Sequence, residues 1–395
     1  MIATLFATAG VAIAALVVLL SVATVVRRYR RERRERRRAT LVEPLRQVLV
    51  RLVTDPTGDD PSEEHVELLA TPPRTWRALE PTVLDMLRKV RGESRDRLVA
   101  LVVAHGTVER MRRRTRRPGA VGRAHAAELL GLLRRREGRD DLVRLLSDRD
   151  PEVRLVAARA LGELGDTSAA PALLASLVTE RSVPLRVVAR SLARLGPQTG
   201  STLVEGLRSP DALVRSVCAE ISGLLGVTAA QESLLAVTDA DPDDDVRIRA
   251  ARALGRIGLP SALPVLVAAT APDRPAPLRA VAAGALGDLG GTAPVQFLEA
   301  LLDDADLRVS TNAGRAMTRA GAAGLLRLRQ VAASAGDAGA CAREALAVHA
   351  LSHGLSTGPS RPIAPPSSSD PEATVPPRPR EPGLPAASAQ DARSS

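Results

Sequence analysis

Aromatic residues are nearly absent from this chain of 395 residues, which holds one Trp, one Tyr and two Phe. Cores of α/β folds and β-sandwiches usually need several aromatic side chains to fill their volume, whereas thin stacked helices can be packed with Ala, Leu and Val. Glycine and proline, at 29 residues each, are too frequent for one long coiled coil and lack the period of collagen. The composition therefore predicts an all-α, layered protein built from short elements.

Cysteine and the motifs of catalytic sites are also scarce. The two cysteines, Cys218 and Cys341, have no C-x-x-C partner, so we expect small buried side chains and not metal ligands. The sequence contains no phosphate-binding glycine loop, no G-x-S-x-G motif and no H-E-x-x-H motif. We therefore predict no catalytic residue, no cofactor and no metal site.

The basic residues are almost all arginine, and two runs account for the formal net charge of +10. Residues 27–38 contain nine Arg and two Glu, and residues 110–117 contain six Arg. The rest of the chain has 40 basic and 43 acidic residues, a balance of −3. This balance argues against a specific nucleic-acid partner. The second run is either a solvated helix face or a patch that meets a membrane or an acidic partner.

Residues 2–26 contain no charged side chain. At about 1.5 Å per helical residue, this length crosses a bilayer core of roughly 30 Å, so we predict a transmembrane helix over residues 1–26. Nine arginines follow the apolar segment and none precedes it, which distinguishes it from a cleaved signal peptide. The same asymmetry predicts a single-pass plasma-membrane protein with its N-terminus outside and the rest in the cytoplasm.

The first arginine run lies in the juxtamembrane segment, residues 27–40. We expect it to stop transfer through the membrane and to bind anionic lipid headgroups, at about 1 kcal/mol per arginine near the surface. The predicted lipid-facing residues are Arg27, Arg28, Arg30, Arg31, Arg33, Arg34, Arg36, Arg37 and Arg38.

An internal repeat fills the middle of the chain. The segment DPEVRLVAARALGELGD at 150–166 recurs in altered form, as in VRIRAARALGRIG at 246–258 and LRAVAAGALGDLG at 278–290. An arginine recurs at intervals of 29 to 32 residues. The recurring arginines are Arg123, Arg154, Arg186, Arg215, Arg247, Arg279 and Arg308.

The sequence of each repeat predicts a helical hairpin. Its first helix has the i, i+3, i+4, i+7 spacing of one buried face, formed by Val153, Val156, Ala157, Ala160, Leu161 and Leu164. We expect the paired glycines after this face, such as those at 162 and 165, to end the first helix, because glycine accepts a positive φ. A hairpin of about 31 residues cannot bury its apolar face alone, so neighbours must stack into a right-handed superhelical α-solenoid.

The sequence at 150–162 resembles HEAT repeats of the short phycobilisome-lyase-like kind, with the pattern D-P-x-V-R-x-x-A-A-x-A-L-G. This resemblance implies that the repeat arginine and a loop aspartate form a ladder between adjacent repeats, and therefore that the seven arginines named above are structural. A ligand-binding row of arginines is the alternative. HEAT repeats also occur in the enzyme deoxyhypusine hydroxylase, which holds iron with His-Glu pairs, but none of the five histidines here is followed by Glu.

The flanks of the repeats differ from them in pattern. Residues 41–118 show apolar helical stripes without a clear repeat, so we predict a helical neck and N-terminal cap ahead of a repeat domain at 119–353. Residues 354–395 are rich in Pro, Ser and Ala, and we predict a disordered tail.

These features together favour a membrane-anchored cytoplasmic scaffold or adaptor over an enzyme. We expect it to bind protein partners through a groove of the repeats, at exposed residues of the second helices, because the core and ladder residues serve stacking. A membrane enzyme is one kind of partner that this location would suit. A repeat-based enzyme or a bilin-lyase-like subunit is the alternative.

Overall fold

Each repeat folds into a long first helix, a tight turn and a shorter second helix in the computed structural model, which describes residues 19, 21–22, 24–29, 42–54 and 63–354. These described residues contain helices and turns and no strand, as the sequence predicts. The first helices are α6 (Ala120–Leu133), α8 (Pro151–Leu164), α10 (Leu185–Leu195), α12 (Ala212–Leu225), α14 (Asp244–Ile257), α16 (Ala276–Leu289) and α18 (Leu307–Arg319). The second helices are α7 (Arg139–Leu145), α9 (Ala170–Ala175), α11 (Gly200–Gly206), α13 (Gln231–Ala240), α15 (Leu263–Ala268), α17 (Val295–Ala300) and α19 (Ala322–Ala332).

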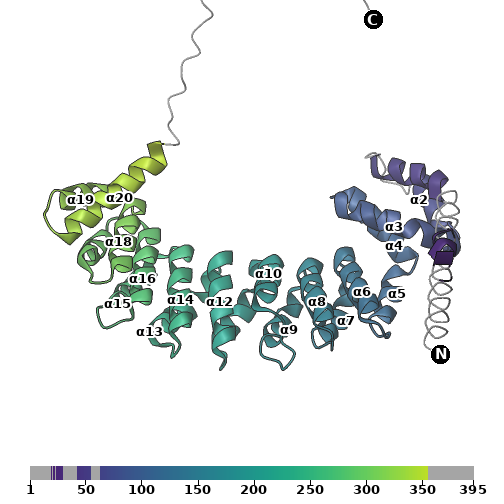
Figure 1. Cartoon of the computed structure of the whole chain (residues 1–395), viewed down its shortest axis with the longest axis horizontal. Helices are drawn as coiled ribbons and strands as arrows, with labels where there is room; N and C mark the ends of the chain where they lie inside the picture. The colour runs from purple at the N-terminus through teal and green to yellow at the C-terminus, as the bar shows by residue number, and fades with distance from the viewer. Residues whose placement is uncertain (1–18, 20, 23, 30–41, 55–62, 355–395) are drawn as a thin grey trace, which may run out of the picture. The chain divides into compact units, whose positions relative to one another are not determined.

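The first helices form one row and the second helices form another. Each first helix from α6 to α18 contacts the next first helix along the chain, and Figure 1 shows the two rows running side by side. Ala and Leu side chains fill the space between them, and Leu161, Leu254 and Leu286 are each no more than 1% exposed. The small alanines let neighbouring helices approach closely, which is why so few aromatic residues suffice.

Glycines inside the first helices make this close approach possible. A Cβ at Gly287 in α16 would lie 2.6 Å from the Cα of Ala316 in α18, which is closer than two carbons can pack. The same contact joins Gly162 to Ser191 and Gly255 to Ala285. Our expectation that these glycines end the helix was wrong, because they lie within it and are buried. The glycines three residues further on, at 165, 258 and 290, do end it and have positive φ.

Aspartates begin many of the first helices. Asp150 is the N-cap of α8, and its side chain accepts hydrogen bonds from the backbone N–H groups of Glu152 and Val153. Asp211 and Asp243 do the same for α12 and α14. Each cap satisfies N–H groups that have no partner inside the helix, for about 1 kcal/mol.

The region before the repeats is helical but not regular. Residues 42–54 are helical, and α2 (Glu63–Leu69), α3 (Pro73–Lys89), α4 (Glu93–Ala104) and α5 (Thr107–Arg114) follow. Trp76 in α3 is 1% exposed and stacks on the ring of His105, with the ring centroids 3.7 Å apart. The side chain of Ser94 donates to the carbonyl of Val53. These contacts hold the helices of the cap together ahead of α6.

The chain divides into two units, residues 1–349 and 350–395. Of the second unit the structure describes only residues 350–354, the end of α20 (Asp337–Gly354), so the rest of the predicted tail lies outside the described residues. In the part of the chain that is described, no helix is both long enough and apolar enough to cross a membrane. Most of the predicted span, residues 1–18, 20 and 23, lies outside that part.

Candidate functional site

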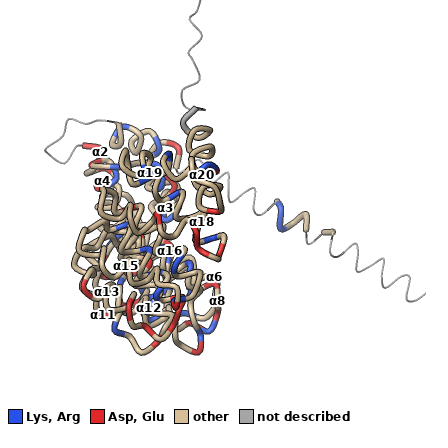
Figure 2. The backbone as a smooth tube through the Cα atoms, turned by 90° about the vertical axis from the view of Figure 1, so that its left-hand side faces the viewer, with Lys and Arg blue, Asp and Glu red and all other residues tan. Residues whose placement is uncertain are grey.

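Three of the seven repeat arginines form the expected ladder. Arg215 donates through Nε and Nη2 to the carboxylate of Asp241, in the loop between α13 and the next first helix α14, at 2.7 and 2.8 Å. Arg123 makes the same bidentate pair with Asp148, and Arg279 makes it with Asp304. Figure 2 shows acidic and basic positions interspersed along the repeats. Such bidentate pairs fix the orientation of one repeat against the next.

Each acceptor aspartate stands two residues before the cap of the following first helix. Burial alone would raise the pKa of the Asp241 carboxyl, but hydrogen bonds from Arg215 and from the backbone of Asp243 outweigh burial, so its pKa lies below the ordinary value. One carboxylate thus links the arginine of one repeat to the loop of the next. The ladder arginine therefore needs this aspartate, and a repeat without it cannot complete the contact.

The ladder is interrupted at Arg154 and Arg247. Arg154 donates instead to the backbone carbonyls of Asp148 and Arg149, and the position where the next aspartate would stand is Ser182. Arg247 pairs with Asp244 in its own helix. The Nε atoms of both arginines are buried without a hydrogen-bond partner.

Arg186 and Arg308 occupy a different position in their helices. The ladder arginines lie four residues after the helix cap, whereas Arg186 lies two residues after Pro184 and Arg308 two residues after Asp306. Arg308 binds its own cap, Asp306, and Arg186 is exposed. Reading all seven arginines as one equivalent set was therefore wrong for these two, because the helices begin at a different point relative to the arginine.

Three of the six arginines of the second run pair with the carboxylates of Asp141 and Glu80. Asp141 in α7 is buried and accepts hydrogen bonds from Arg112 at 2.9 Å, from Arg116 at 3.2 Å and from Arg144 at 3.1 Å. Arg110 pairs with Glu80 in α3. Arg112 and Arg116 thus join the cap to the first repeat, whereas Arg113, Arg114 and Arg117 are exposed, as a solvated helix face would be.

Of the predicted lipid-facing arginines, the structure describes two. Arg27 and Arg28 lie in a helical segment and are exposed. The other seven, Arg30, Arg31, Arg33, Arg34, Arg36, Arg37 and Arg38, lie outside the described residues.

A cleft of about 740 Å³ lies where the cap meets the first three repeats. Its walls come from α3, the loop between α3 and α4, the start of α4, and the first helices α6, α8 and α10. Six arginines and two glutamates line it, together with apolar side chains such as Leu132 and Val156. The charged residues are Arg88, Arg91, Arg95, Arg134, Arg159, Arg194, Glu128 and Glu163. We expected the contact surface on the second helices, whereas this cleft lies on the first.

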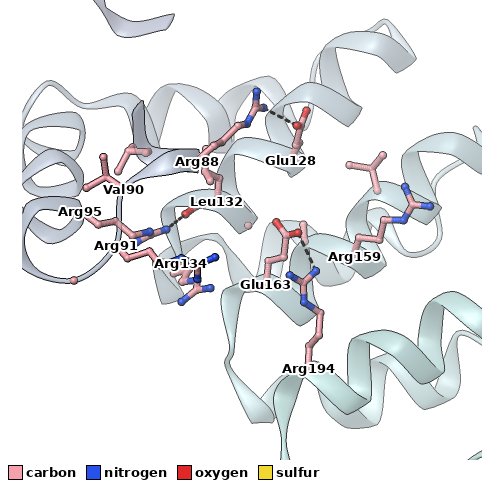
Figure 3. A pocket seen from close by; sticks show the side chains of 15 residues that line it. Arg88, Val90, Arg91, Arg95, Glu128, Leu132, Arg134, Arg159, Glu163 and Arg194 are labelled. Carbon is pink, nitrogen blue, oxygen red and sulfur yellow. Dashed lines mark hydrogen bonds and ion pairs between the residues drawn. The ribbon is translucent and has the colours of Figure 1, made fainter. Parts of the chain in front are cut away.

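Only part of this positive charge is compensated. Arg88 donates to Glu128 at 2.7 Å, and Arg194 donates to Glu163 at 3.0 Å. Arg91, Arg134 and Arg159 are exposed and make no ion pair with any described residue. Figure 3 shows Arg91, Arg95 and Arg134 gathered on one side of the cleft, with Arg159 on the other.

The pKa of Arg95 reflects the positive charges around it. Its Nη2 donates to the carbonyl of Leu132 near the end of α6. Burial lowers the pKa of Arg95, and the nearby charge of Arg134 lowers it further. Like charges held this close are stabilised by an anion placed between them.

Arg134 has a strained backbone. It ends α6 with φ 52° and ψ 38°, and among the described residues it is the only non-glycine residue with positive φ. The helices α8, α12 and α14 end at glycines in this left-handed region. An arginine here costs about 1 kcal/mol relative to glycine, and such costs tend to occur at functional sites.

A second cavity of about 590 Å³ adjoins the first and shares Arg159 with it. Arg186 and Arg190 of α10 also line it, and no acidic residue does. Arg186, which the repeat pattern assigned to the ladder, therefore lies on this basic surface instead.

The described residues hold no group of three or more His, Cys, Asp or Glu side chains placed to bind a metal ion. Cys218 is buried, and burial raises the pKa of its thiol to about 12, so it is not a thiolate at neutral pH. Arginine side chains are the main polar groups of the two cavities.

Sequence reasoning did not single out Arg91, Arg95, Arg134, Arg159 or Arg194. The cleft brings together cap and repeat residues that are distant in the chain, so no local motif marks it. One local signal was present: α6 ends in Arg134 where the other repeats carry glycine.

A model of HEAT repeats matches residues 112–193, 200–282 and 231–318, which together make up about half of the chain. The chain belongs to the HEAT-repeat family. The match covers five of the seven first helices in full, and it covers α10 up to residue 193 and α18 up to Thr318. No curated protein matches the chain.

Three solved structures that the chain is similar to share little sequence identity with it. Human deoxyhypusine hydroxylase is 20% identical over 71% of this chain and 97% of its own, with a TM-score of 0.29. The CpcE–CpcF complex of phycocyanin lyase from Nostoc is 21% identical over 68% and 98%, with a TM-score of 0.25. Kap121p is 11% identical over 72% and 38%, with a TM-score of 0.45. At these identities and scores they add nothing to the family assignment.

Proposed function

We propose that this HEAT-repeat protein is a membrane-tethered scaffold that binds a protein partner on the cytoplasmic side and carries out no catalysis itself. The observation that carries the proposal is the open, arginine-lined surface on the first helices α6, α8 and α10, which the stacking of the repeats leaves unoccupied. Core leucines and ladder arginines hold the repeats together, whereas Arg91, Arg134 and Arg159 make no ion pair within the described part of the chain. Charged side chains that are exposed and unpaired in a cleft are available to a ligand.

The tether rests on the sequence of residues 1–40. An uncharged segment followed by nine arginines suits a single-pass helix whose juxtamembrane arginines bind anionic headgroups. Confinement to the membrane surface raises the effective concentration of the scaffold toward a membrane-bound partner, such as a membrane enzyme. The tether and the repeat surface thus both promote binding of a membrane-bound partner.

The orientation is tested with two reporters fused after Ser395, one active only in the cytoplasm and one active only outside it. We expect the cytoplasmic reporter to be active and the fusion to sediment with the membrane fraction. A fusion that lacks residues 1–40 should leave the membrane fraction and keep its cytoplasmic activity. Activity of the outside reporter would overturn the orientation, and release of the intact fusion by a salt wash would overturn the transmembrane tether.

A further inference from the structure

We infer that the arginine cleft binds an extended acidic segment of the partner protein, which lies across α6, α8 and α10 with its carboxylates on Arg91, Arg134 and Arg159. This inference rests on the scaffold function proposed above and names the chemistry of the partner.

The charge of the cleft selects an anion. Six arginines face two glutamates, and both glutamates are already paired, Glu128 with Arg88 and Glu163 with Arg194. The remaining guanidinium groups have no carboxylate among the described residues. An arginine fork matches a carboxylate in two parallel hydrogen bonds, so acidic side chains suit this surface.

The length of the basic surface fits a peptide chain and not a single small ion. The two cavities share Arg159 and together continue from the loop before α4 to Arg186 and Arg190 on α10. Neighbouring packed helices lie about 8–10 Å apart, so the surface from α6 to α10 spans roughly 20 Å. An extended peptide rises about 3.3 Å per residue, so roughly six residues cover this length.

The walls of the cleft disfavour a membrane surface or a nucleic acid. The arginines line a cleft, which a single extended chain can enter more readily than a flat sheet of headgroups can. No aromatic side chain lines either cavity, so bases would find no stacking partner. Leu132 and Val156 offer apolar contacts to the side chains of a peptide.

The test is fluorescence anisotropy of the full chain in mild detergent with a labelled eight-residue peptide of alternating glutamate and serine. We expect saturable binding that weakens steeply with added salt, and no binding of the same peptide with glutamine in place of glutamate. Arg159→Ala should weaken binding about tenfold, because it removes a charged hydrogen-bond donor. Equal binding of the glutamine peptide would overturn the inference.

Arg252→Ala is the matched control. Arg252 of α14 and Arg159 of α8 both lie nine residues after their helix caps and both are exposed, but Arg252 lines neither cavity. We expect Arg252→Ala to change the affinity by less than about twofold. Equal losses in the two variants would show general charge attraction in place of a site, and would overturn the inference.

Arg134→Gly separates binding from folding. Glycine suits the left-handed backbone at this position, so we expect the Tm to stay the same or rise while the peptide affinity falls about tenfold. Unchanged affinity in this variant would contradict the role of Arg134.

Two further binding measurements test other ligands of the cleft. Binding to phosphatidylserine vesicles that depends on Arg159 would replace the peptide with a lipid surface, and inorganic phosphate that binds as tightly as the peptide would replace it with a small anion. Both outcomes overturn the inference. Peptide binding that survives a failed reporter experiment would leave the site standing and refute only the tethered orientation.

Discussion

Leu254→Asp should destabilise the repeat domain by about 4 kcal/mol or more, because it places a carboxylate in a core that has no partner for it. Leu254 is 1% exposed in α14, which packs against α12, α13 and α16. The measurement is urea unfolding of the full chain followed by its helical circular dichroism. Because each repeat depends on its neighbours, the loss of helical signal should extend beyond one hairpin.

Arg252→Asp controls for the new charge. Arg252 lies in the same helix two residues earlier and is exposed, so an aspartate there stays in water. We expect the unfolding midpoint of this variant to lie close to that of the parent. If Leu254→Asp unfolded at the parent midpoint as well, the packing of α14 described above would be wrong.

Gly287→Ala should destabilise the protein by about 1–3 kcal/mol, although alanine is the better helix former. A Cβ at Gly287 would meet the backbone of Ala316 at 2.6 Å, so α16 and α18 would have to move apart. Overpacking of a contact between two backbones cannot be relieved by a change of rotamer. Thermal unfolding of the full chain measures the effect.

Gly284→Ala, one turn earlier in the same helix, should have the opposite sign. Its Cβ would lie 3.8 Å from the nearest atom, the Nη2 of Arg319, which is an ordinary contact. Here only the gain in helix propensity remains, about 0.5–1 kcal/mol in favour of the variant. A destabilising effect of equal size at both positions would show that α16 does not meet α18 through Gly287.

Much of the fold could be predicted from the repeat because its signals are local. The apolar spacing from Val153 to Leu164 marks the buried face of α8, and the structure buries the predicted side chains except Val156, which is half-buried and lines the cleft. Gly165 at the end of the helix has the positive φ that its position requires. Hydrophobic period and helix caps act within a few residues, so they can be read without the structure.

The role of Gly162 could not be predicted from local signals. Glycine has two uses, to end a helix or to let another backbone approach, and the sequence alone does not distinguish them. At Gly162 the choice is made by Ser191, which belongs to the next repeat. The ladder shows the same limit, because Arg186 and Arg308 match the spacing of the repeat but lie at a different distance from their helix caps.

The cleft could not be predicted because its residues meet only in space. Arg91 and Arg95 come from the cap, whereas Arg159 and Arg194 come from the second and third repeats. Arginine is frequent throughout this chain, so its presence marks no site by itself. Arg91, Arg134 and Arg159 are distinguished by lining the cleft while making no ion pair with any described residue, and this combination is a property of the folded structure.

The central claim is that a protein partner docks on the first helices at the arginine cleft, and photo-crosslinking in living cells tests it most directly. A photoreactive amino acid replaces Glu163 in the cleft or, as the control, Arg256 at the equivalent position of α14. We predict a discrete crosslinked protein from position 163, weakened by Arg159→Ala, and none from position 256. The same crosslinked products from both positions, or none from position 163, would contradict the account.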